Sequence, residues 1–302
     1  MRRPNDGQAH PFLKWAGGKS QLLPEILERL PAEIDTYYEP FVGGGAVFFA
    51  LAAKRRFKRA VLTDRNQDLV DVYRALQEDV DKVIRALRTH AERHTEEHYY
   101  EVRAQSPRSL AQRAARIIYL NKTGYNGLYR VNSSGRFNVP FGRYANPGIL
   151  DEPNLRAVSS VLAKVKLGTT DFAGVCDQAG PRDAVYLDPP YLPLSKTAYF
   201  TAYAREQFGL EEHRRLALVF GQLARRRVAA VLSNSDTAET RALYAPFEVE
   251  TVTATRAINS APTKRGKITE ILVTSPACAT PRPHRGSTHR QRRRSPEKTL
   301  DP

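Results

Sequence analysis

The chain has 302 residues, of which 41% are hydrophobic and 26% are charged, a balance typical of globular proteins with one or two domains. It contains no uncharged apolar run of the roughly 18 residues that a membrane-spanning helix needs, and its arginine-led start lacks the apolar core of a signal peptide. Two cysteines, Cys176 and Cys278, cannot build a disulfide framework, so we expect a cytoplasmic protein. The formal net charge of +15 favours a polyanionic partner, with nucleic acid ahead of a membrane surface.

Part of the positive charge lies at the C-terminus. Residues 276–302 hold seven Lys or Arg, two acidic residues and five prolines, with too few apolar side chains to offset the entropy of ordering. The composition predicts a disordered basic tail, for which a merely solubilising end is the alternative. Residues 1–275 keep a positive excess of their own, so the body of the protein is expected to be basic as well.

The first elements along the chain predict a βαβ unit. They are a helix over 22–30, a strand over 36–42, a Gly43-Gly44-Gly45 turn, a buried helix over 46–56, and a strand over 59–63 that ends at Asp64. A strand, a glycine turn, a helix and a second strand in this order indicate a mainly parallel sheet.

The rest of the chain predicts a helical and loop-rich insert, followed by a return to strands and helices. Residues 68–119 show a charged helical pattern interrupted at Ser106-Pro107, and residues 121–147 are rich in Gly, Asn, Arg and aromatic side chains. Four further strands are expected over 165–170, 184–187, 229–233 and 269–273. We therefore predict an α/β fold with a Rossmann-like catalytic domain formed by 1–80 and 153–275, a recognition insert over 81–152, and the tail.

The glycine turn and the acid after it indicate a nucleoside-type ligand. Gly43 and Gly45 let backbone N–H groups approach a ligand closely, and Asp64 follows Gly43 by 21 residues, where an acid suits ribose hydroxyls. The dinucleotide fingerprint fails because position 48 is Phe48 rather than Gly or Ala. A cofactor without a pyrophosphate fits better, and S-adenosylmethionine is the candidate, with a purely structural turn as the alternative.

Two other chemistries find no support in the sequence. Gly18-Lys19-Ser20 resembles the end of a phosphate-binding loop, but Leu13 stands where its first glycine is required. The zinc signature of nucleobase deaminases is absent from the sequence. The seven histidines are scattered, and no metal site is predicted.

The Asp188-Pro189-Pro190-Tyr191 turn, which follows a buried apolar strand, is the candidate catalytic centre. Two prolines fix the backbone and remove two donors, so the turn presents rigid acceptors at the end of a strand. The Asp188 carboxylate and the Pro189 carbonyl would accept both hydrogens of an exocyclic amine and localise its lone pair. Methyl transfer from a sulfonium could then proceed directly, with Tyr191 stacked on a flipped-out base.

The combination of motifs resembles the DNA adenine-N6 methyltransferases of the Dam type, from about Phe12 to Ser275. The resemblance rests on Phe12-Leu13-Lys14-Trp15-Ala16-Gly17-Gly18-Lys19, Glu39-Pro40-Phe41-Val42-Gly43-Gly44-Gly45, Asp64-Arg65-Asn66-Gln67-Asp68-Leu69, Tyr125-Asn126-Gly127-Leu128-Tyr129-Arg130, Phe137-Asn138-Val139-Pro140-Phe141-Gly142 and Asp188-Pro189-Pro190-Tyr191. It implies contacts to S-adenosylmethionine from Trp15, Lys19, Phe41, Gly43, Gly45, Asp64, Phe172 and Asp188, with Phe172 beside its adenine.

The segment over 121–147 has the composition of a DNA-reading surface, because arginines alternate there with aromatic residues. A bland basic loop is the alternative from composition alone. The resemblance implies that Arg130 reads guanine, that Leu128 and Pro140 meet thymine methyl groups, and that Tyr125, beside Asn126, enters the base stack. It also implies a Lys14 contact at the first base, within the site GATC. Ala145-Asn146 departs from close relatives that can carry lysines there, which predicts a lost phosphate contact.

These observations predict a monomeric or weakly associating enzyme that methylates adenine N6 in double-stranded DNA, using S-adenosylmethionine and no obligate protein partner. It is expected in the cytoplasm, associated with the nucleoid through DNA. The rivals are an N4-cytosine methylase, because the same turn suits both amines, and a sequence-specific DNA-binding protein with an inactive site. The Dam-like insert disfavours the first, and the intact Trp15, Lys19, Asp64 and Asp188 disfavour the second.

Overall fold

One seven-stranded sheet forms the centre of the protein. The computed structural model describes residues 7–15, 17–192, 208–255 and 267–278, and the strand order is β3-β2-β1-β4-β5-β7-β6. The strands β3, β2, β1, β4 and β5 are parallel to one another, whereas β7 is antiparallel to both β5 and β6. The strands are β1 (Ile34–Glu39), β2 (Phe57–Thr63), β3 (Val165–Gly168), β4 (Ala184–Leu187), β5 (Ala229–Ser235), β6 (Glu248–Thr255) and β7 (Lys267–Thr274). The Rossmann-like, mainly parallel sheet predicted from the sequence is confirmed.

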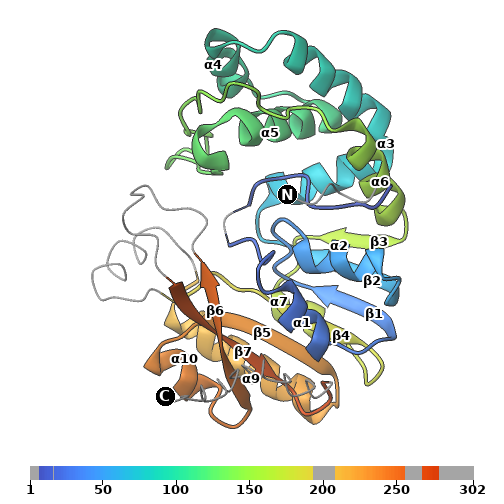
Figure 1. Ribbon diagram of the computed structural model, residues 1–302, viewed down its shortest axis with the longest axis vertical. Coiled ribbons are helices and arrows are strands. Elements are labelled where there is room, and N and C mark those ends of the chain that lie inside the picture. Colours follow the sequence, from blue (N-terminus) through green and yellow to red (C-terminus); the bar gives the residue numbers. More distant parts are fainter. Residues whose placement is uncertain (1–6, 16, 193–207, 256–266, 279–302) are drawn as a thin grey trace, which may run out of the picture.

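The strands bury alternate side chains on opposite faces of the sheet. On β1, Tyr37 belongs to one core cluster and Tyr38 to the other, and Tyr186 and Leu187 divide in the same way on β4. This two-residue period is what a strand covered on both faces requires. The helices α1 (Leu23–Arg29) and α2 (Ala46–Ala53) contribute to the first cluster, whereas α7 (Phe172–Cys176), α9 (Leu210–Arg225) and α10 (Ala238–Leu243) lie with the second (Figure 1).

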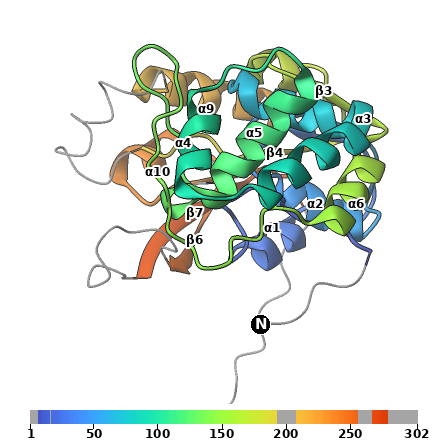
Figure 2. The same cartoon turned by 90° about the horizontal axis from the view of Figure 1, so that it is seen from above.

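The remaining helices gather at one end of the sheet, at the top of Figure 1. They are α3 (Gln67–Glu92), α4 (Glu96–Ala104), α5 (Leu110–Thr123) and α6 (Glu152–Leu162), and the short 3-10 helix η1 (Tyr125–Gly127) follows α5. Figure 2 shows these helices from above. Asp79 interrupts α3 with φ −157° and ψ 81°, next to the boundary placed at residue 80. The division of the chain at residues 80 and 153 stays a prediction.

Several element boundaries differ from those expected. The strand expected over 36–42 ends at Glu39, since Pro40 has no N–H for a sheet ladder. The strand expected over 165–170 ends at Gly168, and Asp171 then caps α7 through its side chain. The strand expected over 229–233 extends to Ser235. Strand β6 was not predicted from the sequence.

The C-terminal prediction is corrected at its first residues. Pro276, Ala277 and Cys278 follow β7 as a turn, and the Cys278 thiol donates to the Ala230 carbonyl at 3.2 Å. The rest of the predicted disordered tail, residues 279–302, lies outside the described residues. None of the helices in the described part is long and apolar enough to cross a membrane.

Candidate active site

The predicted catalytic and cofactor motifs meet at one edge of the sheet. The glycine turn follows β1, Asp64 follows β2, and Asp188 follows β4. Because β1, β2 and β4 are parallel neighbours, their carboxyl ends lie at the same edge, which is where open α/β sheets bind their ligands.

The glycine turn is packed too tightly for larger residues. Gly43 and Gly45 have φ +47° and +69°, a left-handed conformation that side chains disfavour. A Cβ on Gly43 would lie 2.9 Å from Cδ1 of Trp15, and a Cβ on Gly45 would lie 2.8 Å from the hydroxyl of Tyr73. The Trp15 indole therefore lies against the backbone of this turn, so these two segments assigned to the cofactor are neighbours.

Asp64 joins the ends of β1 and β2. Its Oδ2 accepts a hydrogen bond from the Gly43 N–H at 3.1 Å, and its Oδ1 accepts one from the Asn66 N–H at 2.9 Å. Burial raises the pKa of Asp64, and these two N–H groups oppose that change. Each carboxylate oxygen keeps a second lone pair, so the geometry fits a ligand that carries two neighbouring hydroxyls.

Asp188 pairs with a buried cation. Nζ of Lys19 lies 2.9 Å from Oδ1 of Asp188, and the Ser233 hydroxyl donates to the same oxygen at 2.9 Å. Burial raises the pKa of Asp188, while Lys19 and Ser233 lower it. Lys19 is only 7% exposed and also donates to the Gly17 carbonyl at 2.6 Å. Lys19, predicted as a cofactor contact, thus forms an ion pair with the predicted catalytic carboxylate and lowers its pKa against the effect of burial.

The rest of the turn is held beside this ion pair. Nζ of Lys19 lies 4.7 Å from the ring centre of Tyr191, and the Tyr191 hydroxyl donates to Oε2 of Glu270 on β7 at 2.7 Å. Pro189 is buried and Pro190 is exposed. Asp188 and Tyr191, two of the four predicted catalytic residues, therefore contact Lys19 at the end of β4.

Two predicted cofactor residues form an aromatic pair beside the glycine turn. The rings of Phe41 and Phe172 are 5.6 Å apart, and the Arg215 guanidinium lies 4.5 Å from the centre of the Phe172 ring. Phe172 is 3% exposed, so its ring already has neighbours. The structure brings Phe41 and Phe172 together, and the adenine contact stays a prediction.

Lys14 connects the N-terminal segment to the recognition insert. Its backbone N–H donates to Oδ1 of Asn121 at 2.8 Å, and the Asn121 amide donates to the Lys14 and Gly127 carbonyls at 2.7 and 2.9 Å. Nζ of Lys14 lies 4.3 Å over the Tyr144 ring. Asn121 was not predicted from the sequence, although a buried amide at the end of a helix is a signal for such a link.

The other predicted DNA contacts line one loop system. The Tyr125 N–H donates to the Pro140 carbonyl at 2.9 Å, Tyr125 is 45% exposed, and Asn126 adopts a left-handed φ of +54°. Leu128 is partly buried against the core. These residues are therefore neighbours, as a shared recognition surface requires.

Arg130 is exposed, and its side chain is held by hydrogen bonds to Asn138. Its Nε donates to Oδ1 of Asn138 at 2.7 Å, and its Nη2 donates to the Asn138 carbonyl at 3.1 Å. A bridge between Val131 and Phe137 closes the hairpin that carries this pair. The guanidinium is thus held in one direction while part of its donor set stays available.

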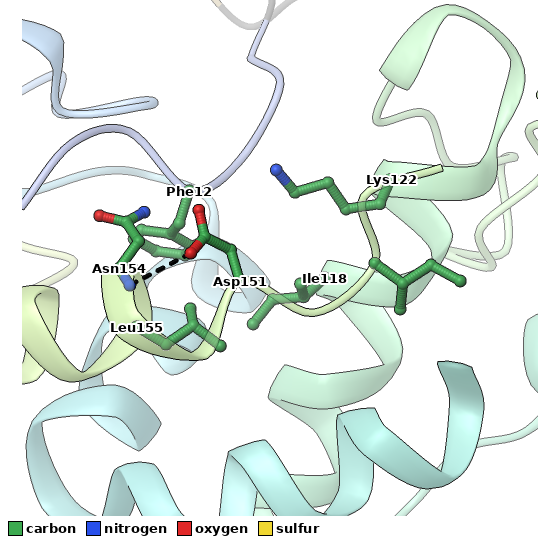
Figure 3. Close-up of a pocket in the computed structure, with 7 residues that line it drawn as sticks. Phe12, Ile118, Lys122, Asp151, Asn154 and Leu155 are labelled. Carbon is green, nitrogen blue, oxygen red and sulfur yellow. Dashed lines mark hydrogen bonds between the residues drawn. The ribbon is translucent and has the colours of Figure 1, made fainter. Parts of the chain in front are cut away.

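A small pocket lies apart from the predicted site. Lys122 extends from α5 toward Phe12 and Asp151, whose carboxylate caps α6 through the Asn154 N–H (Figure 3). Burial and the neighbouring Lys14 lower the pKa of Lys122. The pocket contains none of the predicted site residues, and within the described ranges no cluster of three or more His, Cys, Asp or Glu could hold a metal.

Known proteins resemble this chain over most of its length. Residues 15–258 match the family described as D12 class N6 adenine-specific DNA methyltransferase. The type II methyltransferase M.MjaIII of Methanocaldococcus jannaschii is 43% identical over 285 residues, which cover 88% of this chain and 99% of that protein. The type II methyltransferase M1.LlaDCHI of Lactococcus lactis subsp. cremoris is 41% identical, with 91% and 98% covered. The DNA adenine methylase of Escherichia coli K12 is 38% identical, with 86% and 93% covered.

Proposed function

Since this chain belongs to the D12 class of N6 adenine-specific DNA methyltransferases, we propose that its Asp188-Pro189-Pro190-Tyr191 turn is the catalytic centre. The enzyme methylates N6 of adenine in DNA and uses S-adenosylmethionine. The observation that carries the proposal is the ion pair between buried Lys19 and Asp188 at the shared edge of β1, β2 and β4.

Asp188 and Pro189 prepare the target amine. The exocyclic amine of adenine is a weak nucleophile because its lone pair is delocalised into the ring. The Asp188 carboxylate accepts one N–H hydrogen bond and the Pro189 carbonyl accepts the other, which localises the lone pair on N6. The Lys19 ammonium and the Ser233 hydroxyl, both at 2.9 Å from Oδ1, favour the ionised form of Asp188, whereas burial opposes it. Tyr191 stacks on the base once it has left the duplex.

The cofactor residues surround the glycine turn. When bound, S-adenosylmethionine supplies a methyl group activated by a sulfonium charge. Asp64 would bind the ribose hydroxyls, and Gly43 and Gly45 let the turn pack closely against Trp15 and Tyr73 beside that carboxylate. Trp15 and the Phe41–Phe172 pair provide apolar walls, in line with their positions against the turn.

The recognition insert reads the sequence GATC. Arg130 donates to guanine O6 and N7, Leu128 and Pro140 meet thymine methyl groups, and Tyr125 enters the stack that base flipping opens. Lys14 and Asn126 complete the DNA contacts. The linkage of Lys14 to the insert through Asn121 supports this common surface. Duplex DNA is then the only partner the reaction needs, and the enzyme acts in the cytoplasm at the nucleoid.

Removal of the Asp188 charge tests the catalytic assignment. Asp188→Asn keeps the shape and an acceptor for Lys19, so it should fold but lose methyl transfer, whereas Asp188→Ala would also leave Lys19 buried without its counter-ion. Asp64→Ala should instead weaken S-adenosylmethionine binding by about 1.5–3 kcal/mol, as for hydrogen bonds to a charged group. Methylation rates and calorimetry separate the two effects. A folded Asp188→Asn variant with near-normal turnover would refute the catalytic assignment.

Substitution of Arg130 tests the recognition assignment. Arg130→Ala should leave cofactor affinity unchanged and cost about 1–3 kcal/mol of discrimination at the guanine. Arg130→Lys is the matched control, because lysine keeps the charge but loses the two-donor fork. Methylation rates on GATC duplexes and their single-base variants, at one salt concentration, provide the measurement. An equal loss on every duplex would indicate a phosphate contact instead.

A further inference from the structure

The end of β5 runs beside the catalytic turn. The pairing of β4 with β5 ends at Leu187 and Leu232, and β5 continues for three more residues, Ser233, Asn234 and Ser235. All three are buried, and Asn234 is fully buried. Buried polar side chains need hydrogen-bond partners, and these three find theirs on the turn and its flanks.

The three side chains hold both ends of the turn. The Ser233 hydroxyl donates to Oδ1 of Asp188 at 2.9 Å. At the other end, the Leu192 N–H donates to Oδ1 of Asn234 at 3.4 Å, and the Ser235 hydroxyl donates to the Leu192 carbonyl at 2.8 Å. Because the two prolines between these ends have no N–H groups, the turn depends on its flanks for anchorage.

His213 on α9 fixes the orientation of the Asn234 amide. Oδ1 of Asn234 also accepts from the Ser235 N–H at 2.9 Å, so the two backbone donors identify this atom as the oxygen. Nδ2 then faces Nδ1 of His213 at 3.3 Å. An amide donor needs a lone pair on Nδ1, which places the imidazole proton on Nε2.

The surroundings of His213 favour the neutral imidazole. Its side chain is fully buried, and the Phe208 ring lies edge-on to it with the ring centres 4.9 Å apart. Burial lowers the pKa of His213 to about 4, and the backbone of Pro190 opposes that change. Nε2 makes no hydrogen bond of normal geometry within the described part of the chain. The ring thus lies between Asn234 and the catalytic turn.

We propose that Asn234, held in its orientation by His213, is a positioning residue that sets the direction of the Asp188 and Pro189 acceptors. The proposal rests on the function proposed above for that turn. A misplacement of about 1 Å at a reacting group can cost about 100-fold in rate, so the loss of this anchor should lower turnover more than it lowers binding.

Asn234→Asp provides the sharpest test. The new carboxylate can still accept from the Leu192 and Ser235 N–H groups, but its other oxygen would face the Nδ1 lone pair of His213. The contact is favourable when Nδ1 carries a proton, which requires a change of tautomer in the neutral ring but not in the imidazolium, so the variant should raise the pKa of His213. Its single-turnover rate relative to the wild type should be highest at low pH and fall as pH rises through that pKa.

A pair of His213 variants provides the second test. Glutamine offers both an acceptor and a donor, so His213→Gln should keep turnover within about twofold of the wild type. Leucine offers neither, so His213→Leu should lower the single-turnover rate by about 10–100-fold with KM values for S-adenosylmethionine and DNA nearly unchanged. Tyr244→Phe is the control. It removes a buried hydroxyl in the core beside α9, and that hydroxyl has no hydrogen-bond partner among the described residues. Thermal melts report on folding.

The outcomes separate this proposal from the function of the turn. A folded His213→Leu variant with the wild-type rate would overturn the positioning role. If Asp188→Asn is inactive in the same assay, only the positioning role has failed. If Asp188→Asn keeps its turnover, the assignment of the turn has failed first.

Discussion

Glu39 is a buried carboxyl group at the end of β1, close to the proposed catalytic centre. It is 2% exposed, and its Oε2 accepts a hydrogen bond from the Tyr37 hydroxyl at 2.9 Å. Burial raises the pKa of Glu39 to about 8, and the Asp188 charge contributes to that increase. Glu39 therefore favours its uncharged form at neutral pH.

The protonation of Glu39 predicts a pH-dependent stability. Between the ordinary pKa of 4.5 and about 8, the folded protein holds a proton that the unfolded chain has released, so stability falls as pH rises through this window. Glu39→Gln keeps an acceptor for Tyr37 and removes the titration. The wild type should lose up to about 1.4 kcal/mol per pH unit relative to Glu39→Gln in that range.

Denaturant unfolding of both proteins at pH 5 and pH 8 measures this difference. The comparison of the two proteins cancels other groups that titrate in the same range, such as His90, whose pKa burial lowers to about 4. A constant difference between wild type and variant across the range would mean that Glu39 is ionised in the fold.

At the residue scale, the sequence placed acids at the site but not their partners. Asp64 and Asp188 could be assigned because each follows an apolar strand, where parallel sheets collect ligands. Except for the Asn66 N–H beside Asp64, the partners of this site come from segments distant in the chain. Ser233, 45 residues from Asp188, and Glu270, 79 residues from Tyr191, carry no local signal that points to the turn.

At the scale of elements, the α2 N-terminus depends on its glycine. Gly45 is the N-cap residue of α2 with φ +69°, and Tyr73 on α3 packs over it while donating to the Gly43 carbonyl at 3.1 Å. The strand-turn-helix unit and α3 are therefore joined at one point, directly at the proposed cofactor site.

Gly45→Ala should lower both stability and S-adenosylmethionine affinity. The left-handed backbone costs about 1–2 kcal/mol for a residue with a Cβ. The new methyl group would also lie only 2.8 Å from the Tyr73 hydroxyl, which would have to move. Gly135→Ala is the matched control, because Gly135 has φ +71° and no atom lies within 4 Å of the place that a methyl group would take there. Thermal melts and cofactor calorimetry measure the two effects. Equal destabilisation in both variants with unchanged affinity would argue against the Tyr73 contact.

The predicted strands match the structure where the strand is a clear apolar run. They differ where pairing with another strand determines whether a segment is a strand and where it ends. β4 was predicted with its observed ends, since all four residues are apolar and bounded by polar ones. β6 alternates Glu, Thr and Val over Glu248–Thr255, and its pairing with β7 provides the stabilisation that local composition does not. β5 extends to Ser235 because antiparallel pairing with β7 reaches Glu270, a partner that propensity cannot reveal.

At the scale of the whole molecule, the basic charge is shared between the folded body and the C-terminal segment. The segment is anchored before its charged part begins: the Cys278 N–H donates to the Ser275 carbonyl at 3.0 Å, and the Ser275 hydroxyl donates to the Val228 carbonyl at 2.7 Å. A deletion that starts at Pro276 would remove the Cys278 contacts, whereas one that starts at Ala279 would leave them intact.

Deletion of residues 279–302 should preserve cofactor binding and turnover, because the last strand in the described part of the chain ends at Thr274. Apparent DNA affinity should fall, and the dependence of binding on salt should become shallower, because seven basic residues are lost. Each phosphate contact contributes about 0.9 to the slope of log affinity against log salt, so the change can reach about 6. The loss should be similar on GATC and on altered duplexes, since phosphate contacts carry no sequence information. A full-length variant with those seven residues changed to glutamine separates the effect of the lost charge on DNA binding from the effect of the shorter chain. An unchanged slope in both proteins would show that the segment takes no part in DNA binding.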